Sequence, residues 1–220
     1  MVFTPPSSFV IRSREFGNGQ EYDLESDSNI MPDHYVKRLW RTRSLPGPEG
    51  RTVQFINKDS VDRAILYTVT ERGSALLVRN GSATKGAEEV ARVLWESGRN
   101  VDKSRMSIGT KSGMFKEMLK KGGSFASATP SRIFVGPDGL EYKWKVVLEG
   151  SNPVFPDSSF RVLYCKDSKH PIATTARFVQ RDGEYNDETY PIYIAERGLW
   201  MESWIIATTA ILEGWDKLRS

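Results

Sequence analysis

The sequence predicts a mainly β protein, an antiparallel β-barrel of about 11–12 strands wrapped around a hydrophobic C-terminal helix. Two observations lead to this prediction. From residue 35 onward, short runs with period-two alternation follow one another, separated by dipeptides that favour turns. Residues 199–218 instead repeat apolar side chains at helical spacing around most of the circumference, which is typical of a helix buried on nearly all sides.

The clearest strands form a β-hairpin around the Gly-Pro-Asp-Gly turn at 136–139. In the run 140–148, apolar residues occupy every second position and Glu141, Lys143 and Lys145 lie between them, which is the pattern of a half-buried strand. One short helix is predicted at 114–121. The other predicted strands are 35–41, 52–56, 63–69, 75–79, 89–95, 105–109, 132–135, 160–165, 172–179 and 190–195.

Three environments could bury the C-terminal helix: a bilayer, the groove of a partner protein, or the protein's own sheet. Its polar stripe is narrow and consists of Glu202, Thr209, Glu213 and Asp216. These charges leave an apolar run too short to span a bilayer. About eight strands close around side chains alone, whereas about eleven leave room for a helix. We therefore expect a barrel threaded by its own helix, with a partner groove as the alternative.

The first 34 residues differ in composition from the rest of the chain. They carry two basic and six acidic side chains, a balance of −4 in a chain whose net charge is +3. They are rich in Ser, Pro, Asn and Gly and show little periodicity, which is typical of disorder. We predict a largely disordered acidic segment at 1–34 and a single β-barrel domain at 35–220, with the helix 199–218 at its centre.

Four local motifs carry a resemblance to known proteins: EVARVLW at 89–95, FVGPDGLEYKWK at 134–145, PIA at 171–173 and IIATT at 205–209. Over about residues 50–218 the chain resembles a fungal domain-of-unknown-function family of the DUF6593 type. The layout of strands and helix resembles the tubby C-terminal-like fold, a group that includes phospholipid scramblases. The resemblance implies the fold, and it implies phosphoinositide binding only by analogy, because no motif identifies the binding residues position by position.

The sequence offers little catalytic material, since it holds two histidines and one cysteine. Cys165 and His170 are close in the chain, but the residues between them read as a turn and no third group orients them. Metal-ligand patterns such as paired cysteines or His-x-x-x-His do not occur. We therefore predict no catalytic residue, no metal and no cofactor, and we expect a non-enzymatic binding module.

The best candidate binding residues surround one tryptophan; they are Lys37, Arg38, Trp40, Arg41 and Arg43. Guanidinium groups bind phosphates in a bidentate manner and an indole suits a membrane interface, so an anionic lipid surface is the first expected partner. The alternative is a solvated strand face with Trp40 packed on the barrel. A second basic cluster flanks the short helix and consists of Lys111, Lys116, Lys120 and Lys121.

Composition and the lack of long apolar runs indicate where the protein resides. One cysteine suits a reducing compartment, and neither a signal peptide nor a transmembrane run is evident, so we expect a cytoplasmic protein that can be membrane-peripheral. The net charge of +3 is too small to indicate nucleic acid. The expected partner is therefore an anionic membrane surface or a protein. The alternative function is a protein-interaction or structural barrel without lipid or catalytic activity.

Overall fold

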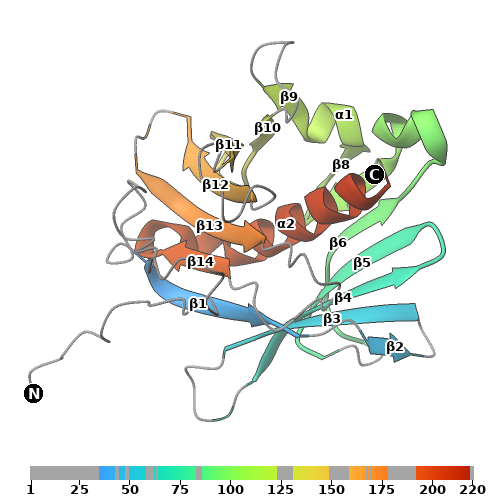
Figure 1. The fold of residues 1–220 in the computed structure, drawn as a ribbon, viewed down its shortest axis with the longest axis horizontal. Helices are drawn as coiled ribbons and strands as arrows, with labels where there is room; N and C mark the ends of the chain where they lie inside the picture. Colours follow the sequence, from blue (N-terminus) through green and yellow to red (C-terminus); the bar gives the residue numbers. More distant parts are fainter. Residues whose placement is uncertain are drawn as a thin grey trace, which may run out of the picture. The chain divides into compact units, whose positions relative to one another are not determined.

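Fourteen strands among the described residues form one antiparallel sheet in the computed structural model of this protein (Figure 1). The acidic segment expected at 1–34 lies outside the described residues, as does Arg43. All described residues belong to one unit, Tyr35–Ser220. They are 35–42, 45–47, 50–57, 62, 64–82, 86–122, 131–148, 159–166, 168, 170–177 and 192–218.

The prediction of a mainly β, antiparallel protein is confirmed. The strands are β1 (Tyr35–Arg41), β2 (Leu45–Gly47), β3 (Gly50–Ile56), β4 (Ile65–Arg72), β5 (Ala75–Asn80), β6 (Glu89–Leu94), β7 (Arg105–Ile108), β8 (Lys111–Met114), β9 (Lys120–Gly122), β10 (Ser131–Val135), β11 (Glu141–Leu148), β12 (Ser159–Cys165), β13 (Pro171–Arg177) and β14 (Ile192–Ala195). Each predicted strand overlaps one of these. The sequence missed β2, β8 and β9, because these short segments, LPG, KSGM and KKG, show no alternation of apolar and polar residues.

The strands follow the order β8-β7-β6-β5-β4-β3-β1-β14-β13-β12-β11-β10-β9, with β2 on β3. Within the described residues the sheet therefore ends at β8 and β9, and its closure into a barrel is not confirmed. The short helix expected at 114–121 is smaller: α1 spans Phe115–Met118 and packs on β8, β9 and β10. The 3-10 helix η2 (Gly98–Lys103) also packs on α1. These two elements lie beside the open ends of the sheet.

Arg132 of β10 packs inside the sheet next to α1. Its guanidinium carbon lies 5.0 Å from the ring centre of Phe115 and 4.1 Å from that of Trp215. Its Nη1 donates a hydrogen bond of 3.0 Å to the carbonyl of Leu119. The planar guanidinium stacks on both aromatic rings. Side-chain stacking around α1 thus fills space near the point where backbone pairing stops.

The C-terminal helix α2 spans Glu202–Lys217 and follows the 3-10 helix η3 (Glu196–Met201). Residues 199–201 of the predicted helix belong to η3. Gly198 of η3 packs so closely that an added Cβ would lie 2.7 Å from Cγ2 of Ile172. The predicted burial on nearly all sides does not extend to the ends of 199–218, because Leu199 and Trp200 are exposed before α2 and Leu218 after it. Between them α2 is buried from Trp204 to Leu212.

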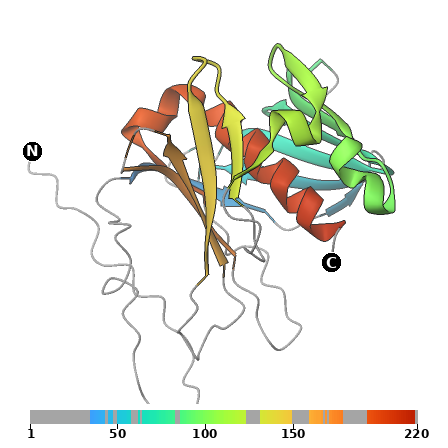
Figure 2. The same cartoon turned by 90° about the horizontal axis from the view of Figure 1, so that it is seen from above.

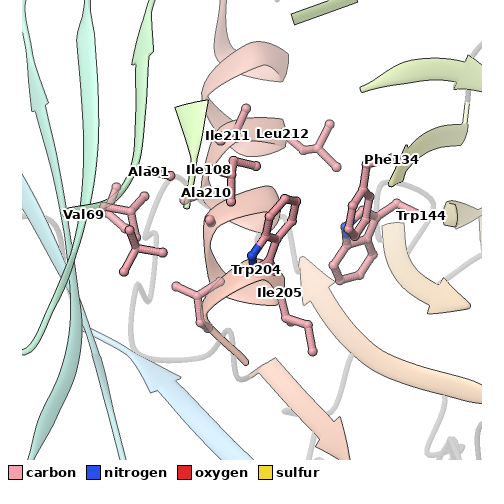
Figure 3. Close-up of a cluster of buried hydrophobic side chains, with 14 of the residues drawn as sticks. Val69, Ala91, Ile108, Phe134, Trp144, Trp204, Ile205, Ala210, Ile211 and Leu212 are labelled. Carbon is pink, nitrogen blue, oxygen red and sulfur yellow. The ribbon is translucent and has the colours of Figure 1, made fainter. Parts of the chain in front are cut away.

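Helix α2 runs between the strands β3–β8 and the strands β9–β14 (Figures 1 and 2). Its side chains contact both groups of strands: Val69 and Ala91 lie on one side of the helix, and Phe134 and Trp144 on the other (Figure 3). The indole of Trp144 donates a buried hydrogen bond of 2.9 Å to Oγ1 of Thr208. This bond fixes the position of β11 against the helix.

Candidate functional site

The predicted basic cluster lies on β1, whose side chains alternate between the two faces of the sheet. Lys37 pairs with Ile194 and Leu39 pairs with Ile192, and both isoleucines are buried against the core. By alternation, Lys37, Leu39 and Arg41 face α2, while Arg38 and Trp40 face outward. The four candidate residues that the structure describes, Lys37, Arg38, Trp40 and Arg41, therefore do not form one surface.

The two inward cations are ion-paired with carboxylates of α2. Nζ of Lys37 lies 2.5 Å from Oε2 of Glu202, and Nη1 of Arg41 lies 2.9 Å from Oε2 of Glu213. Both pairs are largely shielded from solvent. Burial, reinforced by the charge of Glu202 and a hydrogen bond to it, raises the pKa of Tyr67. Lys37 and Arg41 thus neutralise the polar stripe of an otherwise apolar helix.

The two outward residues form a cation–π pair. The guanidinium carbon of Arg38 lies 4.9 Å from the centre of the Trp40 ring. Both side chains are half-buried, and Nε1 of the Trp40 indole is itself buried. Arg38 pairs with Tyr193 of β14, which extends the outward surface across the neighbouring strand.

An aromatic cluster that sequence reasoning missed continues this outer surface, because a bulge between Tyr35 and Lys37 shifts the alternation of β1 at its start. The rings of Tyr35 and Tyr193 have their centres 5.8 Å apart. The hydroxyl of Tyr35 shares a hydrogen bond with Oγ1 of Thr174 on β13. Burial raises the pKa of Tyr35 to about 12. The alternation of Tyr193 with Ile192 and Ile194 was the available signal.

The second basic cluster is dispersed. Lys111 donates a hydrogen bond of 2.6 Å to the carbonyl of Gly136, so its ammonium group caps the β10–β11 turn. Nζ of Lys121 lies 3.8 Å from Oδ2 of Asp102, the carboxylate that accepts a hydrogen bond from the Trp215 indole. Lys116 and Lys120 are exposed, but they belong to different elements. The cluster as predicted does not form a single site.

A small hollow lies between α2 and strands β1, β3 and β4. It is lined by Arg41, Arg51, Val53, Phe55, Val69, Glu71, Ala210 and Glu213. Its volume of about 10 Å³ accommodates one water molecule at most. Lys217 pairs with Glu71 at 2.9 Å, and Arg41 pairs with Glu213. The charges at this hollow are used in holding α2, and the space is too small for a substrate.

The one cysteine and the described histidine lie near each other in the chain but in different settings. Cys165 is half-buried at the end of β12, and His170 is exposed in the following turn. Among the described residues, no group of three or more histidine, cysteine, aspartate or glutamate side chains could hold a metal ion. Within the same residues, no helix combines the length and apolar character needed to cross a membrane.

Comparison with known proteins places the chain in a family. The profile of the family of unknown function DUF6593 matches residues 47–216. This chain belongs to the DUF6593 family. No curated protein and no solved structure matches it.

The DUF6593 region extends from the end of β2 nearly to the end of α2. It includes the EYKWK segment of β11 and both carboxylates, Glu202 and Glu213, that β1 neutralises. Strand β1 precedes it, so every described residue of the predicted basic cluster lies outside the matched segment. The match to the family therefore gives no support to a binding role for the basic cluster.

Proposed function

We propose that this DUF6593 protein is a non-enzymatic module that binds anionic membrane surfaces peripherally, in the cytoplasm, with phosphoinositides among its ligands. The observation that carries the proposal is the outward Arg38–Trp40 pair on β1. A guanidinium offers a planar fork of donors to a phosphate, and the half-buried indole beside it offers an apolar ring face to the headgroup region. Tyr35 and Tyr193 beside the pair also support membrane binding, since aromatic side chains are common in the headgroup region of membranes.

For the finer fold we infer a tubby C-terminal-like arrangement, in which the sheet wraps around α2 as a barrel. The course of α2 between the two groups of strands supports this inference (Figure 2). An experimental structure would test it through the backbone pairing of β8 with β9, which α1 connects. A closed barrel requires backbone hydrogen bonds between these two strands, and their absence would contradict the inference.

Vesicle flotation tests the proposed function. Purified protein is mixed with vesicles of phosphatidylcholine alone, or with added phosphatidylserine or a phosphoinositide, at low and at physiological salt. We expect flotation with the anionic vesicles only, weakening as salt screens the charges. Absence of binding to every anionic vesicle at low salt would exclude the function.

A pair of variants then tests the role of β1. Arg38→Glu combined with Trp40→Ala is expected to weaken flotation, whereas Arg72→Glu, an exposed charge change at the end of β4, is expected to leave it unchanged. Lys37 and Arg41 are left intact because they hold α2. Equal flotation of both variants would remove Arg38 and Trp40 from the binding surface.

The second candidate function is protein interaction, and one observation favours it. Leu199 and Trp200 are neighbours on η3 and are 40% and 55% exposed. Adjacent exposed apolar side chains of this size are found at protein interfaces. If this function holds, a Leu199→Ser/Trp200→Ser variant loses a partner from a pull-down that the Arg38→Glu/Trp40→Ala variant retains. Unchanged partners in both would oppose it.

A further inference from the structure

The EYKWK segment of β11 has two faces with different chemistry. Tyr142 and Trp144 point inward and are 3% and 1% exposed. The hydrogen bond from Trp144 to Thr208 of α2 fixes this register. Lys143 and Lys145 must therefore point outward, because successive side chains of a strand lie on opposite faces. The segment holds the core on one side and presents two ammonium groups on the other.

Neighbouring strands extend this outward surface. Ile133 of β10 pairs with Lys143 on one side and with Lys120 of β9 on the other. Lys143 also pairs with Tyr164 of β12. These four residues form one row across four strands, and directly paired side chains have their Cβ atoms about 5 Å apart. Lys120 and Lys143 thus lie on one face, on either side of Ile133.

Tyr164 lies among the lysines of this surface and contacts one of them. Nζ of Lys145 lies 4.5 Å from the centre of the Tyr164 ring. Burial raises the pKa of the Tyr164 hydroxyl, so the ring stays neutral beside the ammonium groups. We call Lys120, Lys143, Lys145 and Tyr164 the lysine face.

Carboxylates are scarce around the lysine face. On the outer side of β9–β12, within the described residues, Glu141 is the one acidic side chain. It is paired with Lys166, whose Nζ lies 2.6 Å from Oε2 of Glu141. That pair, and then the charge of Lys120, lowers the pKa of Glu141. Four lysines against one glutamate leave this side with a charge of +3.

We propose that the lysine face is a second surface that docks on anionic lipid headgroups. This inference rests on the proposed function and adds a docking surface separate from the Arg38–Trp40 pair. Lys120 and Lys145 are exposed and Lys143 is half-buried, so all three ammonium groups can reach a flat surface outside the sheet. Tyr164 supplies an amphipathic ring at the same level. Each lysine near an anionic surface strengthens binding roughly fivefold, which corresponds to about 1 kcal/mol.

The lysine face, unlike the Arg38–Trp40 pair on β1, belongs to the part of the chain that the family shares. Its residues lie inside the segment that matches the DUF6593 family, and Arg38 and Trp40 lie outside it. Between β11 and β1 the sheet has three intervening strands, so the two places are about 19 Å apart across the ladder and can be mutated independently.

The test uses the full chain and vesicles of phosphatidylcholine and phosphatidylserine in equal amounts. The variant Lys120→Glu/Lys145→Glu reverses two exposed charges of the lysine face. The matched control, Arg72→Glu/Arg105→Glu, changes the net charge equally at exposed positions on β4 and β7. We expect the first variant to bind at least roughly tenfold more weakly than the control. Thermal unfolding of both should match that of the wild type, since all four side chains are exposed.

Each outcome separates this inference from the function on which it rests. If the wild type floats and only Lys120→Glu/Lys145→Glu loses binding, the lysine face is a docking surface. If the wild type floats and both double variants bind as it does, the inference is wrong although membrane binding stands. If the wild type floats and both weaken equally, binding depends on net charge alone and the inference is again wrong. If the wild type does not float, the proposed function fails and the inference falls with it.

Discussion

At the scale of single residues, two neighbouring threonines of α2 have opposite roles in the core. Both are buried, but their hydroxyl groups differ in bonding. Oγ1 of Thr208 accepts the Trp144 indole at 2.9 Å and donates to a carbonyl one turn back. Oγ1 of Thr209 has no hydrogen-bond partner in the structure. A buried hydroxyl stabilises the fold only when it is bonded.

This difference gives a matched prediction. Thr208→Val leaves the Trp144 indole without its acceptor, so we expect the free energy of unfolding to fall by about 1–3 kcal/mol. Thr209→Val removes an unbonded hydroxyl at nearly constant volume, and we expect stability to be unchanged or raised. Urea unfolding of both variants measures this. Equal losses would show that the indole bond does not hold β11 on the helix.

At the scale of elements, β1 is held on α2 by charge as well as by packing. Lys37 pairs with Glu202 near the first turn of the helix, and Arg41 pairs with Glu213 near its last. We expect Lys37→Glu to destabilise the protein by roughly 1–3 kcal/mol, because it sets two carboxylates side by side in a shielded place. The swap Lys37→Glu/Glu202→Lys should recover most of the loss in chemical unfolding. No recovery would mean that Lys37 acts through its alkyl chain.

The apolar side of α2 makes it the core element of the sheet. Ile211 is fully buried, whereas Leu218 is 50% exposed one residue past the helix. We expect Ile211→Asp to abolish cooperative unfolding, since it buries an unpaired charge among the side chains of both groups of strands (Figure 3). Leu218→Asp should unfold like the wild type. A cooperative thermal transition for Ile211→Asp would refute the central role of α2.

The same elements show what sequence could predict. Alternation in β11 and all-round apolarity in α2 are local patterns, so hairpin and helix were predictable. The sequence could not predict that the basic cluster divides between the two faces of β1. That division depends on the register of β1 against a helix more than 160 residues away in the chain. One signal was present: Glu202 and Glu213 on a buried helix require cationic partners. The sequence also could not predict where the sheet ends, because the short strands β8 and β9 show no alternation of apolar and polar residues.

At the scale of the whole molecule, the fold keeps tyrosine hydroxyls neutral. Burial raises the pKa of Tyr35 to about 12, and burial first, then Glu202, raises that of Tyr67. Burial and a hydrogen bond to Asp138 raise that of Tyr142. These three tyrosines lie on β1, β4 and β11, so their ionisation at high pH destabilises distant parts of the sheet at the same time.

These shifts predict a loss of stability in alkaline solution. A group whose folded pKa is raised contributes fully below its unfolded pKa, near 10 for tyrosine, and its contribution is lost as the pH rises toward the folded pKa. We therefore expect the free energy of unfolding to fall between about pH 10 and pH 12, by up to about 1.4 kcal/mol per pH unit from Tyr67. Urea unfolding from pH 9 to pH 11 measures the slope. Tyr67→Phe removes one ionising group, so its slope should be smaller than that of the wild type. An identical slope would show that Tyr67 does not contribute to the alkaline loss.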